Sequence, residues 1–139
     1  MRNITRIHAI IFRKFNDSYE FLVLKRADRD YWQPLIGIKP EDEREKDFCL
    51  SLSGQIGIKA GDILQIFYTG YKSQQQMLDQ NKQPAIITEF VFGIEVQPWV
   101  KLNLGGSYES SRWYKYRDAV DILANNTHKE GLRKLNAAL

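Results

Sequence analysis

The sequence lacks the cysteines of disulfides and zinc sites, and it lacks long apolar segments. It holds one cysteine, Cys49, among 139 residues, which excludes an intrachain disulfide and a cysteine-rich zinc site. We interpret Cys49 as a small buried apolar residue, with a reactive thiol as the alternative. No apolar run approaches the roughly 20 residues of a membrane span, and the first residues lack the apolar stretch of a signal peptide. These features indicate a cytoplasmic protein that does not engage a membrane.

A strong excess of one charge is also missing. The formal net charge is +3, from 20 basic and 17 acidic residues. This balance is too mild to indicate binding to a nucleic-acid polymer, but it is compatible with a phosphorylated small molecule. A chain of this length buries roughly two-thirds of its unfolded surface. We therefore expect one domain over residues 1–139, and a homodimer is compatible with the composition.

Alternating and β-branched segments predict several strands. Residues 4–15 and 19–24 form a predicted hairpin, because the intervening Asn-Asp-Ser is typical turn chemistry. A short apolar piece spans residues 32–38. Later strands are expected at 63–71, 85–96 and 112–116, with polar loops at 72–83 and 98–106, and helices at 118–124 and 129–139.

One helix is predicted between the early and late strands. Acidic residues crowd 41–47, as they do where a helix begins. Phe48, Leu52 and Ile56 then follow at helical spacing, and Gly57 is suited to a helix end. The alternation over 50–53 also permits a strand. Together the elements predict an α+β fold with a mixed β-sheet flanked by helices, and the pattern alone names no function.

A family resemblance comes from motifs in a fixed order. A basic pair closes residues 24–26, and residues 31–37 read Tyr-Trp-Gln-Pro-Leu-Ile-Gly. Glu43 follows Gly37 with five residues between, and residues 56–58 read Ile-Gly-Ile. This order resembles the Nudix hydrolases, whose box reads Gly-x5-Glu-x7-Arg-Glu-U-x-Glu-Glu-x-Gly-U, with U apolar. The Trp-Gln with its following glycine is similar to the branch that contains dihydroneopterin triphosphate pyrophosphatase.

The resemblance implies a fold, an activity and site residues. It implies an α/β/α sandwich and a pyrophosphohydrolase that cleaves nucleoside or pterin polyphosphates with magnesium or manganese. Glu89 and Glu109 match places where some Nudix enzymes keep an accessory ligand or base. Arg26 matches a residue near the substrate phosphates, and arginine suits phosphate because its planar fork donates two hydrogen bonds.

The box itself departs from the family. Counting back from Gly57 places its central Arg-Glu-U-x-Glu-Glu on residues 50–55, whereas counting forward from Gly37 places it on 51–56. Under either count no carboxylate falls on a metal-ligand position, and only Gln55 offers an oxygen. Magnesium prefers carboxylate oxygens and water. We therefore expect no resident metal, with magnesium or manganese only if the protein is active.

The remaining candidates each have a plainer structural interpretation. Glu43, Gln55, Glu89 and Glu109 are residual catalytic candidates, and a solvated or salt-bridged side chain is the alternative for the acids. The ligand-binding candidates are Arg26 for phosphate, Trp32 for stacking, Gln33 for hydrogen bonding and Gly37 for backbone geometry. For Arg26 the alternative is an ordinary surface arginine, and for Trp32 it is a core residue. His8 and His128 are expected to be isolated.

Three functional hypotheses follow. The first is a divergent but active Nudix pyrophosphohydrolase that uses displaced carboxylates. The second is a Nudix domain that binds a nucleoside or pterin polyphosphate-type ligand, or a protein partner, with hydrolysis impaired or lost. The third is a scaffold. The degenerate box favours impaired hydrolysis.

Overall fold

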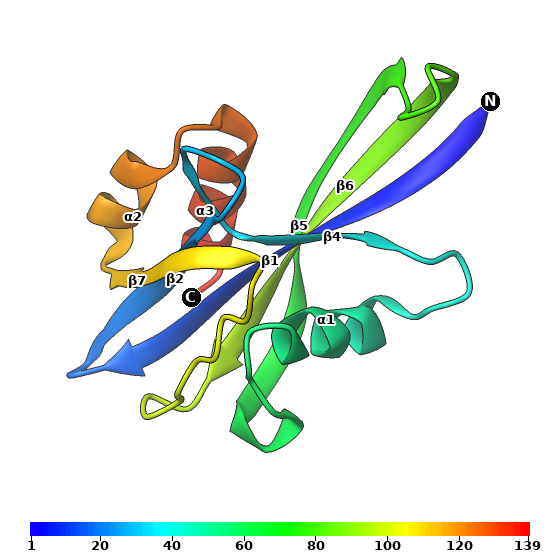
Figure 1. Ribbon diagram of the computed structural model, residues 1–139. Coiled ribbons are helices and arrows are strands. Elements are labelled where there is room, and N and C mark those ends of the chain that lie inside the picture. Colours follow the sequence, from blue (N-terminus) through cyan, green and yellow to red (C-terminus); the bar gives the residue numbers. More distant parts are fainter.

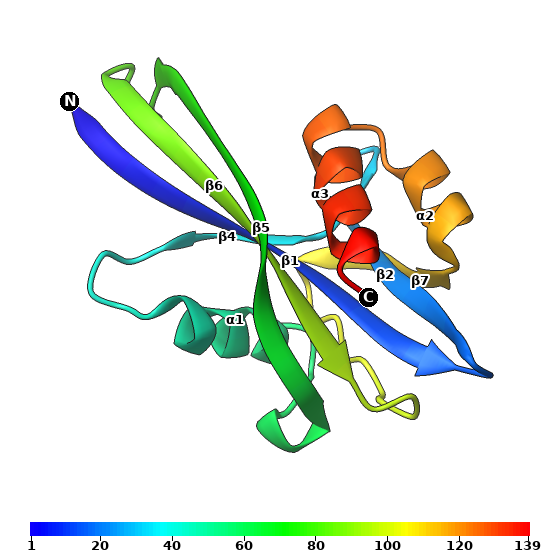
Figure 2. The ribbon, with the colours of Figure 1, turned by 180° about the vertical axis from the view of Figure 1, so that it is seen from behind.

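The computed structural model describes all residues, 1–139, as a mixed sheet between two layers of helices. Helix α1 covers one face, and α2 and α3 cover the other (Figure 1, and from behind in Figure 2). This arrangement confirms the predicted α/β/α sandwich. The elements are β1 Arg2–Phe15, β2 Ser18–Arg26, β3 Trp32–Gln33, β4 Leu35–Lys39, α1 Glu45–Gly54, the short 3-10 helix η1 Ala60–Asp62, β5 Ile63–Leu78, β6 Pro84–Val96, β7 Tyr108–Tyr114, α2 Tyr116–Ile122 and α3 Asn126–Ala137.

Strand β1 organises the sheet. The strand order is β3-β2-β1-β6-β5, and in addition β4 pairs with β1 and β7 pairs with β2. The β1–β6 pair is parallel and the other pairs are antiparallel. Parallel pairing brings residues more than 80 positions apart in sequence into register, for example Arg6 with Glu89.

The predicted hairpin at the start of the chain is confirmed. Asn16 and Asp17 have φ values of 51° and 64°, the left-handed conformation that a tight hairpin turn requires and that these residue types tolerate. The apolar piece after it forms two strands rather than one: β3 pairs with β2, β4 pairs with β1, and Pro34, which has no backbone N–H to donate, lies between them.

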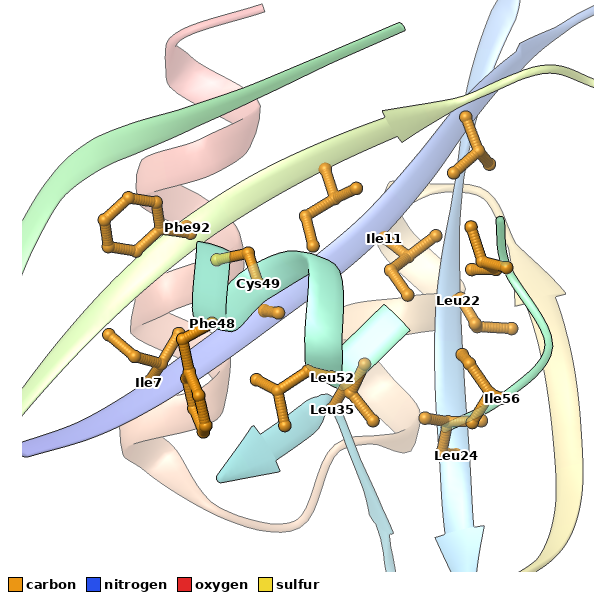
Figure 3. Packing of buried hydrophobic residues seen from close by; sticks show 14 of the residues in the cluster. Ile7, Ile11, Leu22, Leu24, Leu35, Phe48, Cys49, Leu52, Ile56 and Phe92 are labelled. Atoms are coloured by element: carbon orange, nitrogen blue, oxygen red, sulfur yellow. The ribbon is translucent and has the colours of Figure 1, made fainter. Parts of the chain in front are cut away.

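Side-chain alternation along β1 builds two hydrophobic cores. Ile7, Ala9 and Ile11 belong to the core beneath α1, where Figure 3 shows Ile7 and Ile11 near the helix residues Phe48 and Leu52. Ile10 and Phe12, on the alternate positions, belong to the core beneath α2 and α3, whose buried members also include Leu132 and Leu135. Successive side chains of β1 therefore contribute alternately to the cores on the two faces of the sheet.

Helix α1 settles the open choice over residues 50–53 in favour of a helix. Glu45 and Asp47 lie in its first turn, where acidic side chains meet the positive end of the helix dipole. Gly57 follows the helix with φ of 83°, and a Cβ there would lie 2.8 Å from the backbone nitrogen of Asn103. Helix α1 ends at Gly54, three residues before the predicted end, and a turn over residues 55–57 brings the chain to Gly57.

The predicted loop at 72–83 is wrong. Strand β5 continues to Leu78, and its outer part pairs with β6 from Lys72↔Phe90 to Leu78↔Pro84. This segment is polar because it lies at the edge of the sheet with both faces mostly exposed, so it carries no alternating hydrophobic signal. At the C-terminal end, the two predicted helices are separate, and the Asn125 side chain caps α3 by accepting from the backbone nitrogens of Thr127 and His128.

Candidate functional site

The solvent-facing side of α1 is where the box residues lie. Phe48, Cys49, Leu52 and Ser53 are buried against the sheet, whereas Ser51, Gly54 and Gln55 are exposed. Leu52 and Ile56, at 1% and 0% exposure, would be ligand positions in the forward count. Because neither side chain reaches the surface, burial favours the backward count.

The donors on this helix face do not fit a carboxylate-bound magnesium ion. The Ser51 hydroxyl donates to the Asp47 carbonyl oxygen at 3.3 Å and lies 3.4 Å from Glu43 Oε1. Gly54 has no side chain, and Gln55 offers a neutral amide. Nowhere in residues 1–139 do three His, Cys, Asp or Glu side chains gather in a geometry suited to a metal ion. Glu43 is the carboxylate that lies within hydrogen-bond distance of Ser51 on this face of the helix.

Arg26 ends β2 and is engaged by a neighbour. Its Nε donates to Asp28 Oδ1 at 2.8 Å and its Nη2 donates to Asp28 Oδ2 at 3.2 Å. These hydrogen bonds raise the pKa of Arg26 and lower the pKa of Asp28. The planar fork that would bind a phosphate therefore already holds a carboxylate, which a ligand would have to displace.

Trp32 and Gln33 point to opposite faces of the sheet. Trp32 packs against the core beneath α2 and α3, and the Arg112 guanidinium lies 5.2 Å from its ring centre. Gln33 is buried and pairs with Leu24, a residue of the core beneath α1. Because neighbouring strand residues point to opposite faces, these two binding candidates cannot contact the same ring from one side of the sheet.

Gly37 lies in β4 directly beneath α1. A Cβ at this position would approach Leu52 Cδ2 to 2.6 Å and Phe48 Cζ to 2.9 Å. The glycine is therefore explained by the close packing of the helix on the strand.

A polar cluster lies on the other face of the sheet, around Glu89. His8 Nε2 donates to Glu89 Oε2 at 2.6 Å, and Arg6 Nη1 donates to the same oxygen at 3.2 Å. Ser73 Oγ lies 3.4 Å from Glu89 Oε1. The hydrogen bond from His8 is the largest of the effects that hold the pKa of Glu89 at about 2. Glu89 is thus a buried, ion-paired carboxylate, as its alternative interpretation anticipated.

The expectation that His8 and His128 are isolated is wrong, because the fold brings the two residues together although they are far apart in the sequence. Their ring centres lie 5.1 Å apart in an edge-to-face contact between β1 and the first turn of α3. Burial, followed by the charge of His8, lowers the pKa of His128 to about 4. The Nδ1 atoms of both rings are buried without a hydrogen-bond partner. The cluster forms only when β1 pairs with β6 and α3 packs on the sheet, so no local sequence motif predicts it.

The four residual catalytic candidates do not converge. Glu43 and Gln55 lie at the two ends of α1, Glu109 is exposed on β7, and Glu89 lies on the sheet face opposite α1. Cys49 is fully buried in α1, and this burial raises the pKa of its thiol to about 12. That environment matches a packing role.

The fold of the chain is similar to that of solved structures. No known family profile and no curated protein matches the sequence. Among solved structures, a Nudix hydrolase assigned in Listeria monocytogenes is similar with a TM-score of 0.81 at 22% identity, over 96% of this chain and 92% of that one. Dihydroneopterin triphosphate pyrophosphohydrolase of E. coli gives 0.80 at 13% identity, over 97% and 96%.

A third neighbour was solved with a ligand. The Nudix domain of Shewanella oneidensis NrtR, complexed with ADP ribose, gives a TM-score of 0.76 at 11% identity, over 99% of this chain and 89% of that one. The chain has the Nudix fold, which confirms the fold that the motifs in residues 21–58 implied. The α-helices fall short of the length and apolar character that a bilayer-spanning helix requires.

Proposed function

We propose that this Nudix-fold domain binds a nucleoside or pterin polyphosphate-type ligand and has impaired or lost metal-dependent diphosphate hydrolysis. One observation carries the proposal: the solvent-facing side of α1 presents Ser51, Gly54 and Gln55, where a working box presents carboxylates. A bound divalent ion neutralises charge that builds on the phosphates during hydrolysis. A hydroxyl and a neutral amide supply no negative charge to hold such an ion.

Binding does not need those carboxylates. Arg26 lies at the end of β2, and its guanidinium is partly exposed, with the carboxylate of Asp28 in the geometry that a phosphate would take. Exchange of one anion for another at this fork requires no rearrangement of the sheet. Fold neighbours support the ligand class, since the NrtR domain was solved with ADP ribose and the E. coli neighbour is a dihydroneopterin triphosphate pyrophosphohydrolase.

The alternative is a divergent but active pyrophosphohydrolase. Glu43 favours it, because its carboxylate lies beside Ser51 on the helix face where a metal would be needed. A single carboxylate leaves most magnesium ligands to water and to the substrate phosphates, so this alternative predicts weak metal affinity without substrate. Turnover that Glu43→Gln abolishes would support it.

The decisive experiment combines binding and turnover on the purified protein. ATP, ADP-ribose and dihydroneopterin triphosphate are each tested for a rise in melting temperature, which reports binding to the folded state, and for phosphate release with magnesium or manganese. We expect a rise without turnover. Turnover at rates of roughly 1 per second or more, typical of enzymes, would overturn the proposed loss. Absence of any thermal shift would overturn the proposed ligand class.

Restoring the box provides a second, independent test. The triple variant Ser51→Glu, Gly54→Glu, Gln55→Glu should gain manganese affinity by isothermal titration, because the three side chains share one exposed helix face. The matched control, Ser51→Gln with Gly54→Gln, adds similar bulk without charge and should gain none. Equal titrations for both variants would show that this face is not the metal face.

A further inference from the structure

Strand β5 has a bulge in its pairing with β6. Tyr68 is paired with Phe92, and the next regular pair joins Lys72 to Phe90. Between these two pairs β5 contains two more residues than β6. A bulge redirects the side chains of the strand that carries it, and bulges are over-represented next to active sites. The bulge therefore determines which side chains of β5 meet on the face of the sheet that packs against α1.

The bulge is a fixed part of the fold. Gly70 has a φ of 90°, a conformation that glycine adopts without steric cost. The buried Thr69 hydroxyl donates to the backbone oxygen of Val91 at 2.7 Å and accepts from the backbone nitrogen of Tyr71 at 3.2 Å. These hydrogen bonds satisfy backbone groups that the interrupted ladder would otherwise leave unpaired. The side chains on either side of the bulge are thus held in place.

Three aromatic rings and one cation gather at the bulge. The Tyr68 ring centre lies 5.8 Å from that of Phe90 at an interplanar angle of 71°, and 5.4 Å from that of Phe92 at 40°. Phe92 belongs to the core beneath α1 (Figure 3), which anchors the group of rings. Lys72 Nζ lies 5.8 Å from the Phe90 ring centre. Because Tyr68 is 44% exposed and Lys72 is exposed, an aromatic surface and a positive charge lie side by side in solvent.

The positive charge of Lys72 is not neutralised by the protein. Lys72 belongs to none of the ion pairs in residues 1–139. Gln74, two residues further along the same face, is paired with Thr88, and its Nε2 donates to Thr88 Oγ1 at 3.1 Å. A side-chain amide and a hydroxyl both donate and accept hydrogen bonds. Along β5 this face therefore presents an aromatic ring, an unpaired ammonium group and then hydrogen-bonding groups.

We propose that the planar ring of a nucleoside or pterin polyphosphate binds at this surface, which consists of Tyr68, Lys72, Gln74 and Phe90. The inference rests on the proposed function, since it supplies ring-binding residues for that class of ligand. A purine or pterin ring has a flat π-face that stacks on an exposed aromatic side chain such as Tyr68. The ammonium group of Lys72 complements the charge of a phosphate attached to that ring.

Isothermal titration with ATP, ADP-ribose and dihydroneopterin triphosphate tests the two roles. Tyr68→Leu removes the stacking ring and should raise Kd at least roughly five-fold, the lower limit for loss of one base–aromatic stack. Tyr68→Phe keeps the ring and should bind as tightly as the unmodified protein. Lys72→Gln should raise Kd several-fold at low salt. Its Kd should also rise less steeply with salt concentration, because one screened charge contact is missing.

Matched controls remove the same chemical groups elsewhere on the surface. Trp99, which is 70% exposed, and the exposed Lys101 follow β6, and Trp99→Leu and Lys101→Gln should leave Kd unchanged. Full affinity in either Tyr68→Leu or Lys72→Gln would overturn this inference alone and leave the proposed function standing. Failure of the unmodified protein to bind any of the three ligands would overturn the proposed function, and this inference with it.

Discussion

His8 Nε2 and Glu89 Oε2 lie 2.6 Å apart on the sheet face opposite α1, beneath the first turn of α3. An ionised carboxylate only accepts hydrogen bonds, so His8 Nε2 carries the proton of this hydrogen bond. The Nδ1 atoms of His8 and His128 are both buried without a hydrogen-bond partner. The contact between β1 and α3 is therefore sensitive to protonation.

The protein should lose stability as the pH falls from about 6.5 to 4. His128 has a pKa of about 4 in the folded state against an ordinary value of 6.5, so its stabilising contribution is complete above 6.5 and is lost as the pH falls through 4. The loss should reach up to roughly 3 kcal/mol, measured by urea unfolding at stepped pH. His128→Gln, which cannot ionise, should flatten the curve in that range. Parallel curves for both proteins would contradict the prediction.

Glu89→Gln should destabilise the fold by roughly 2–3 kcal/mol, since it leaves His8 and Arg6 without their carboxylate. The figure is below that for a fully buried pair because the Arg6 side chain is 30% exposed, where solvent screens its charge. Urea unfolding at pH 7 measures the change. Glu109→Gln, at an exposed position on β7, is the matched control and should shift stability by no more than about 0.5 kcal/mol.

Gly37→Ala should destabilise the protein by roughly 1–3 kcal/mol because the added methyl group overlaps Leu52 and Phe48. Gly54→Ala tests the same substitution at the end of α1, where nothing lies within 4 Å of the new Cβ. There the higher helix propensity of alanine should stabilise by up to roughly 1 kcal/mol. Opposite signs in thermal unfolding are the expected result, and equal losses would refute the packing explanation of Gly37.

Asp28→Asn should tighten the binding of polyphosphates, because it weakens the partner that now holds Arg26. This prediction rests on the proposed ligand class. Isothermal titration with ADP-ribose should show a several-fold lower Kd for Asp28→Asn and a weaker complex for Arg26→Lys, which lacks the planar fork. Unchanged affinity in both variants would place the phosphates away from β2.

Much of the architecture was predictable because its signals are local. The turn at Asn16 and Asp17, the helical spacing of Phe48 and Leu52, and the alternation along residues 4–15 are short-range patterns that the structure reproduces. The outer half of β5 was not predictable. Its residues are polar on both faces, and its strand conformation comes from backbone pairing with β6.

The candidate site divides in the same way. Residue order alone determined that no carboxylate occupies the central box positions, and burial of Leu52 and Ile56 then decided which count the helix follows. Only the tertiary structure brought His8, Glu89 and His128 together and sent Trp32 and Gln33 to opposite faces. Local sequence encodes period and propensity, whereas a contact across about 80 residues depends on the parallel register of β1 with β6, which no single segment contains.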